Sequence, residues 1–209
     1  ILLTVICMEA KTEQLIEKIR KYAKSVLKEK RFEHSVRVAE TAAFMCGLFG
    51  YDKDIGYLAG LAHDICKNME DSEILSLASE DGKSISEIEK NKPSLLHGRA
   101  AAVLLQEKFS VKNPDVIQAV ANHTLGGLGL CLLAKIIYVA DKVEPGRPQS
   151  TEEYRKKIFS MPLNEMTLFV VQENMEYLKS KQKKIAEPSY EFETDLKNQI
   201  ATENSLRAS

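Results

Sequence analysis

Residues 59–67 read Ala59-Gly60-Leu61-Ala62-His63-Asp64-Ile65-Cys66-Lys67, an apolar run that ends in an imidazole and a carboxylate side by side. Its apolar residues, with Leu58 before them, recur at the three- and four-residue spacing of a helix that has one buried face. Adjacent residues lie about 100° apart around a helix, because it has roughly 3.6 residues per turn. His63 and Asp64 can therefore reach one ion only where the helix end or a neighbouring helix brings that ion close.

The same helical period continues on both sides of this stretch, and no segment shows a convincing strand pattern. Glycine and proline divide the helices, with Gly50 as a C-terminal cap and Pro93 and Pro114 in first turns. The sequence predicts an all-α fold, a single bundle of roughly 8–10 short helices over residues 1–182. A polar, loosely ordered tail is expected over residues 183–209. The predicted helices cover residues 12–30, 31–50, 52–67, 71–78, 130–143, 151–159 and 163–182, with two more beginning at Pro93 and Pro114, and residues 80–92 are expected to form a loop with at most one helical turn.

Composition excludes several classes of protein. The 209 residues are 44% hydrophobic and 28% charged, as in an ordinary globular chain, so wholesale disorder is excluded. The 29 basic and 30 acidic residues give a net charge of −1. Non-specific binding of nucleic acid relies on a broad basic field, so we expect no nucleic-acid partner. A small basic pocket for an anionic metabolite remains compatible with this balance.

The sequence favours a cytoplasmic protein that has no membrane partner. Residues 1–8 are apolar but too short to span a bilayer, and no basic residue precedes them, so we expect no secretory signal. Whether residues 1–7 belong to the native start is left open. Cys7, Cys46, Cys66 and Cys131 lie in apolar stretches without a CxxC spacing, which is typical of buried thiols in a reducing compartment. A homodimer is compatible with the sequence, but no pattern specifies it.

The chain has only four histidines, and their placement favours a shared role. A single histidine on a helix is more often a surface residue or a satisfied core residue. His34, His97 and His123, however, each continue an apolar stripe, where an unpartnered imidazole is costly. Asp141 likewise lies on the stripe that contains Leu133 and Ile137, so its carboxylate should be paired or metal-bound.

Four imidazoles and two carboxylates on inward faces make a nitrogen and oxygen ligand set. Such a set suits Fe, Mn, Co, Ni or Zn, and the lack of clustered thiolates argues against a structural zinc site. Six ligands exceed what one tetrahedral ion uses. The sequence therefore predicts two divalent ions that share a bridging carboxylate.

At this point the chain resembles a known family. The pattern His34 … His63-Asp64 … Asp141 is similar to the HD-domain metal-dependent phosphohydrolases over roughly residues 12–182. Five ordered blocks resemble, within that superfamily, the bacterial symmetrical bis(5'-nucleosyl)-tetraphosphatases. These blocks are Arg31-Phe32-Glu33-His34-Ser35, residues 59–67, Leu96-His97-Gly98, Asn122-His123-Thr124-Leu125-Gly126, and residues 135–147, which end in Asp141-Lys142-Val143-Glu144-Pro145-Gly146-Arg147.

The resemblance implies a helical HD fold, a di-iron centre and hydrolysis of diadenosine tetraphosphate to two ADP. Carried over to this sequence, His34, His63, Asp64 and Asp141 would hold one metal, and Asp64, His97 and His123 would hold the other. Asp64 and Lys67 are the catalytic candidates, and two such ions would activate a water molecule. The sequence departs from the family at Cys66 and in a tail that is longer than the family needs.

Cationic and hydroxyl side chains near these motifs are candidates for binding the phosphates of the substrate. Each also has a simpler interpretation: Lys67 suits a helix C-terminus, Arg37 and Arg99 could pair with surface acids, and Thr124 could cap a helix. The substrate-binding candidates are Arg37, Lys67, Arg99, Thr124 and Arg147.

Two alternatives remain open from the sequence. One is an HD phosphohydrolase that acts on a nucleoside monophosphate, a nucleoside triphosphate or a signalling nucleotide. The other is a metal-containing nucleotide sensor that binds without turnover. The full set of six ligand candidates favours an enzyme over a sensor.

Overall fold

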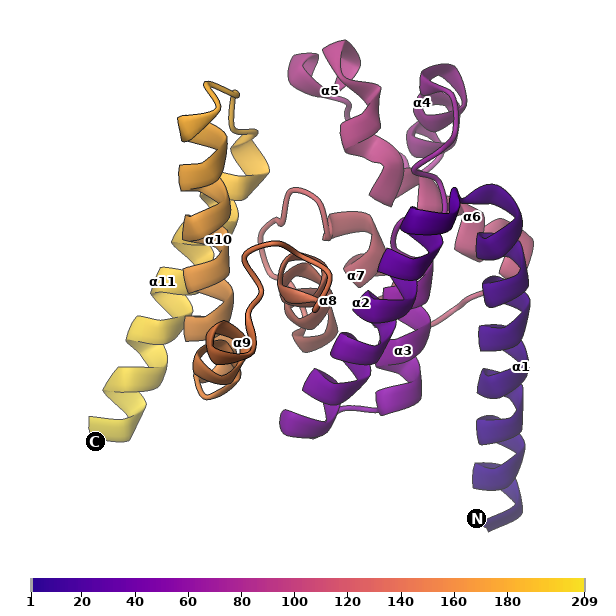
Figure 1. The fold of residues 1–209 in the computed structure, drawn as a ribbon, viewed down its shortest axis with the longest axis horizontal. Helices are drawn as coiled ribbons and strands as arrows, with labels where there is room; N and C mark the ends of the chain where they lie inside the picture. Colours follow the sequence, from indigo (N-terminus) through magenta and orange to yellow (C-terminus); the bar gives the residue numbers. More distant parts are fainter. Residues whose placement is uncertain (1, 209) are drawn as a thin grey trace.

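The computed structural model describes residues 2–208, with side chains described from Lys11 to Arg207, and the regular structure in this range is helical throughout (Figure 1). The all-α prediction is confirmed. Eleven α-helices and one 3-10 helix in the described range slightly exceed the number expected. They are α1 (Leu2–Val26), α2 (Glu29–Leu48), α3 (Lys53–Ala62), α4 (Asp71–Ser79), α5 (Glu87–Asn91), η1 (Pro93–Leu96), α6 (His97–Phe109), α7 (Pro114–Asn122), α8 (Leu132–Val143), α9 (Glu152–Phe159), α10 (Leu163–Ser180) and α11 (Glu187–Ala208).

Helices α2, α3 and α8 form the centre of the fold, and each packs against the other two. In Figure 1, α1 covers one side of this centre and α10 and α11 the other. Helices α2 and α3 approach closely because residue 60 is glycine: a Cβ at Gly60 would lie 2.6 Å from the Cα of Ala39. This close contact brings the end of α3 beside the first turns of α2.

The end of α3 is the main local departure from the predicted helices. The sequence predicts a helix to Lys67, but α3 ends at Ala62 and residues 63–68 form turns. His63 is the C-terminal cap and still has helical dihedral angles, and Asp64 lies in the turn that follows. Because the chain leaves the helix at this point, the side chains of His63 and Asp64 can both face the same space.

The expectation of a loosely ordered tail is wrong, because residues 187–208 form helix α11. Phe192 and Leu196 are fully buried, and the Phe192 ring packs edge-on against Tyr138 of α8 with ring centroids 5.2 Å apart. Lys135 of α8 also donates to Gln199 Oε1 at 2.6 Å. Two buried apolar residues in a mostly polar segment produce little helical periodicity, so the sequence did not predict helix α11. That residues 1–182 form a domain without α11 stays a prediction.

None of the described helices has the length and apolar character needed to cross a bilayer. Cys46 and Cys66 are buried as the sequence predicts, and Cys131 is half-buried. Cys7 lies outside the residues whose side chains are described.

Candidate metal centre

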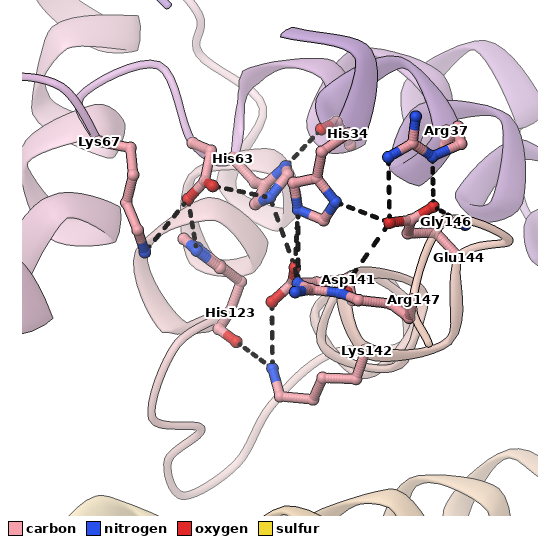
Figure 2. A network of polar contacts seen from close by, with 12 residues as sticks. His34, Arg37, His63, Lys67, His123, Asp141, Lys142, Glu144, Gly146 and Arg147 are labelled. Carbon is pink, nitrogen blue, oxygen red and sulfur yellow. Dashed lines mark hydrogen bonds and ion pairs between the residues drawn. The ribbon is translucent and has the colours of Figure 1, made fainter. Parts of the chain in front are cut away.

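Six side chains from five parts of the fold converge at one place beside α2 and α8, and Figure 2 labels His34, His63, His123 and Asp141 among them. The first turns of α2 supply one histidine, the turn after α3 supplies a histidine and a carboxylate, α6 and α7 supply one histidine each at a helix end, and α8 supplies a carboxylate. They are the six ligand candidates of the sequence: His34, His63, Asp64, His97, His123 and Asp141.

One group of ligand atoms gathers around Asp141. Its Oδ1 lies 3.0 Å from His34 Nε2 and 3.8 Å from His63 Nε2. One ligand atom from each of these three residues falls within 4.8 Å of the other two. The group is therefore compact enough to surround a single ion.

A second group gathers around Asp64. Its Oδ1 lies 2.8 Å from His97 Nε2 and 3.5 Å from His123 Nε2, and its Oδ2 lies 3.7 Å from His63 Nε2. His97 Nε2 is also 2.9 Å from His123 Nε2. His63 lies between the two groups and joins them into one row.

The second nitrogen of each ring, Nδ1, is held by a hydrogen bond. Nδ1 donates to a backbone carbonyl in three of the histidines: His63 to Gly60 at 2.6 Å, His97 to Ser94 at 2.7 Å and His123 to Val120 at 2.7 Å. A carbonyl only accepts, so Nδ1 carries the proton and Nε2 of the neutral ring presents a lone pair. Metal-binding histidines are held in this way, by a hydrogen bond from the ring nitrogen that does not bind the metal.

His34 is held instead by the carboxylate of Glu144, a residue that the sequence reasoning missed. Glu144, whose side chain is 1% exposed, accepts from His34 Nδ1 at 3.0 Å. It also accepts from Arg37 Nε and from the backbone N–H of Gly146, each at 2.5 Å. The only sequence signal for this role is that Glu144 follows Asp141 by three residues, one helical turn.

The residues fit a divalent cation on two observations. First, the buried atoms His63 Nε2 and Asp64 Oδ1 have no hydrogen-bond partner, and His97 Nε2, 2.8 Å from Asp64 Oδ1, has no proton to donate because Nδ1 carries it. Such buried atoms cost about 1–3 kcal/mol each if nothing satisfies them. Second, two imidazoles bound at right angles on one ion would place their nitrogens roughly 3 Å apart. The His97 and His123 nitrogens meet this spacing.

Burial and neighbouring charges give His63, His123 and the two aspartates the protonation states that a cation needs, whereas His34 must release a proton to bind one. Burial lowers the pKa of His63 and takes that of His123 to about 3, so both rings are neutral. Burial alone would raise the pKa of each aspartate, but neighbouring side chains, among them the ammonium groups of Lys67 beside Asp64 and Lys142 beside Asp141, hold both pKa values well below the ordinary range. Burial would likewise lower the pKa of His34, but hydrogen bonds to Asp141 and Glu144 outweigh it and raise it to about 9.

Two of the predicted substrate-binding cations flank the row. Lys67 Nζ lies 2.9 Å from His97 Nε2 and 3.6 Å from Asp64 Oδ1. Arg147 Nη2 lies 2.6 Å from Asp141 Oδ1. Both line a cavity of about 270 Å³, together with His34, Asp64, Asp141 and Arg31. Thr124 Oγ1 is 3.2 Å from His123 Nε2 and also belongs to this site.

The other two predicted substrate-binding cations are engaged elsewhere, and neither lines the described walls of this cavity. Arg37 pairs with the buried Glu144 carboxylate. Arg99 donates from Nε and Nη2 to Asp81 at 2.7 Å, and its Nη2 and Nη1 also donate to the carbonyls of residues 78 and 83 and of residue 84, respectively. Arg31, which the sequence did not single out as a binding residue, lines the cavity in their place.

This chain is similar to several known proteins. The HD domain family matches residues 31–146. The symmetrical bis(5'-nucleosyl)-tetraphosphatase of Staphylococcus aureus is 32% identical over 132 residues, which are 63% of this chain and 68% of that protein. The protein of the same name from Bacillus subtilis is 30% identical over 158 residues, 76% of this chain and 84% of that protein.

A solved structure agrees with these matches. It is described as a predicted HD superfamily hydrolase involved in NAD metabolism from Clostridium acetobutylicum. It superposes with a TM-score of 0.81 at 29% identity, and the match covers 88% of this chain and 97% of that one. All six clustered residues fall inside the region that the HD family matches. The chain therefore belongs to the HD-domain family.

Proposed function

We propose that this protein is a symmetrical bis(5'-nucleosyl)-tetraphosphatase, which hydrolyses diadenosine tetraphosphate to two ADP with two divalent ions. The observation that carries the proposal is the single row of six ligand atoms that has a cation at each end. The Staphylococcus aureus and Bacillus subtilis proteins of this name match this chain over 68% and 84% of their own length, and they support the substrate.

The two ions divide the row between them in this proposal. His34, His63, Asp64 and Asp141 hold one ion, and Asp64, His97 and His123 hold the other. Iron is our first choice, with Mn, Co, Ni or Zn compatible with the same imidazole and carboxylate donors. When bound, two such ions supply an activated water molecule and neutralise phosphate oxygens.

The other side chains of the site bind and orient the substrate. Lys67 Nζ, beside Asp64, neutralises charge on the phosphate that leaves, and Arg147, beside Asp141, binds phosphate on the opposite side. Thr124 Oγ1 donates to a phosphate oxygen or orients the His123 ring. The backbone carbonyls and Glu144 keep the four rings fixed, so the ligand row needs little rearrangement.

The test is product analysis after incubation of the purified protein with diadenosine tetraphosphate and Fe²⁺ under anaerobic conditions. Two ADP per substrate supports the proposal, while AMP plus ATP would indicate an asymmetric hydrolase. Tight binding of the nucleotide with no product would identify a sensor. Elemental analysis of protein purified without a chelator identifies the metal. A cytoplasmic location and a homodimer stay predictions of the sequence.

A further inference from the structure

The cavity over the ligand row has positive charge at both of its ends. Figure 2 shows Lys67 on one side of the histidines and Arg147 on the other. The contacts agree with this view, because Lys67 approaches His97 and Asp64, whereas Arg147 contacts Asp141 and lies 3.5 Å from His34 Nε2. The reacting centre thus lies between two cations.

Arg31 adds a second cation at the Lys67 end. It lies three residues before His34 and lines the same cavity. Its Nη1 donates to the backbone carbonyl of Lys67 at 2.6 Å and to Asn68 Oδ1 at 2.7 Å. These two bonds fix the guanidinium beside Lys67, so its charge faces the cavity from a defined position.

We propose that Arg31 is a specificity-determining residue, which holds the phosphate chain at the Lys67 end and so selects the bond that is cut. This inference rests on the proposed function. In the symmetrical reaction a water oxygen bonds to one central phosphorus, the bond from that phosphorus to the central bridging oxygen breaks, and a proton is released as two ADP form. If the chain slides by one phosphate, the same reaction breaks an outer anhydride and gives AMP plus ATP.

The geometry explains why both ends must be held. The phosphates of the chain carry similar charges, so the ions alone distinguish poorly between adjacent anhydride bonds. A fork of guanidinium donors has a fixed direction and binds phosphate oxygens in one register. With Arg31 and Lys67 at one end and Arg147 at the other, the central bond is the one placed over the row.

A purely structural role for Arg31 is the competing interpretation, because its hydrogen bonds also fasten the turn that carries Asp64. The variant Arg31→Gln removes the guanidinium charge and shortens the donor, so the two roles are separated by what is measured. Loss of a structural clamp would lower stability or metal content. It would not change which anhydride bond breaks.

The experiment measures the ratio of AMP plus ATP to ADP by ion-exchange chromatography, at equal metal loading. It compares wild type, Arg31→Gln and Arg147→Gln, with Arg207→Gln as the matched control, since that arginine is exposed on α11. We expect the ratio to rise about tenfold in both cavity variants, as for loss of one charge-assisted hydrogen bond, and to stay unchanged in the control. A wild-type ratio in Arg31→Gln overturns the inference and leaves the proposed function intact.

A binding measurement separates failure of the inference from failure of the proposed function. Inorganic tripolyphosphate is titrated calorimetrically into the metal-loaded proteins, with no turnover of a dinucleotide required. We expect about tenfold weaker binding in Arg31→Gln than in wild type. If wild type gives no ADP from diadenosine tetraphosphate, the proposed function fails, and equal affinities for tripolyphosphate in the two proteins would then overturn the role of Arg31 as well.

Discussion

His97 Nε2 lies 2.9 Å from His123 Nε2, and both rings donate from Nδ1 to a backbone carbonyl. With neutral rings, two lone pairs face each other in a buried site, an arrangement that is costly unless a donor such as Lys67 Nζ, 2.9 Å from His97 Nε2, or a metal ion lies beside it. Because burial takes the pKa of His123 to about 3, its Nε2 carries no proton at neutral pH. The pair therefore points to a cation shared by the two rings.

Replacing His97 with alanine should remove one of the two metals. We expect metal content to fall from about two ions per chain toward one, because His34, His63 and Asp141 remain to hold the other. Turnover of diadenosine tetraphosphate should fall by several orders of magnitude. Elemental analysis and product analysis on the same preparation check both numbers.

His123→Ala should behave in the same way, and the double variant should be little worse than either single one, because residues that act as a unit are not additive. A His97→Ala protein that keeps two metals and near-normal hydrolysis, and loses only a few kcal/mol of stability, would show that His97 is an ordinary core residue.

Glu144→Gln should weaken metal binding without emptying the ligand row. The amide cannot accept from both Arg37 and His34 as the carboxylate does, so the His34 ring loses its fixed orientation. We expect about 10- to 100-fold lower metal affinity, measured by competition with a chelator. Glu176→Gln, on an exposed part of α10, is the matched control and should bind metal as wild type does. Equal affinities in the two variants would contradict a positioning role for Glu144.

The sequence predicted the helical fold and the ligand candidates because both depend on local pattern. His34, His123 and Asp141 each lie on the apolar face of a helix, where polar side chains are rare enough to stand out. The structure brings these residues together, and their roles as ligands stay a proposal. The break after Ala62 was hidden, since nothing in the apolar run from Leu58 to Ile65 marks the end of a helix.

The partners of the arginines could not be predicted, because they are fixed by tertiary contacts. Arg37 and Arg99 meet acids that lie 107 and 18 residues away in the chain. A long guanidinium side chain pairs with whichever carboxylate the fold brings near it, and sequence spacing carries no information on that. Arg31 was overlooked as a binding residue for the same reason, since its contacts lie 36 and 37 residues away.

The pair between Asp81 and Arg99 should make stability depend on acid pH. Burial would raise the pKa of Asp81, but its hydrogen bonds to Arg99 outweigh this and lower the pKa below its ordinary value of 3.8. A carboxyl group whose folded-state pKa is lowered adds stability above the unfolded-state pKa, and that stability is lost as the pH falls through the folded-state pKa. Asp81→Asn should therefore lower the free energy of unfolding by about 1–3 kcal/mol at pH 6 and by much less near pH 3.

The measurement is urea unfolding of chelated protein between pH 3 and pH 6, so that metal binding does not contribute. Asp71→Asn, at the exposed start of α4, is the control for the loss of one negative charge. A loss of stability in Asp81→Asn that is equal at both pH values would rule out the charged pair as its source.

The aromatic ring of Phe192 should fasten α11 to the segment that follows His123. Phe192 is fully buried, and Gly126 has a φ of +77° and no side chain, which lets the ring approach to within 2.2 Å of where a Cβ would stand. Ser189 adds a hydrogen bond to the Leu125 carbonyl at 2.8 Å. Phe192→Ala should lower the free energy of unfolding by about 3–5 kcal/mol, as for other buried aromatic residues. Urea unfolding measures this loss, and Tyr190→Ala, an exposed aromatic on the same helix, should cost about 1 kcal/mol or less. Equal effects of the two substitutions would mean that α11 does not pack on the core through Phe192.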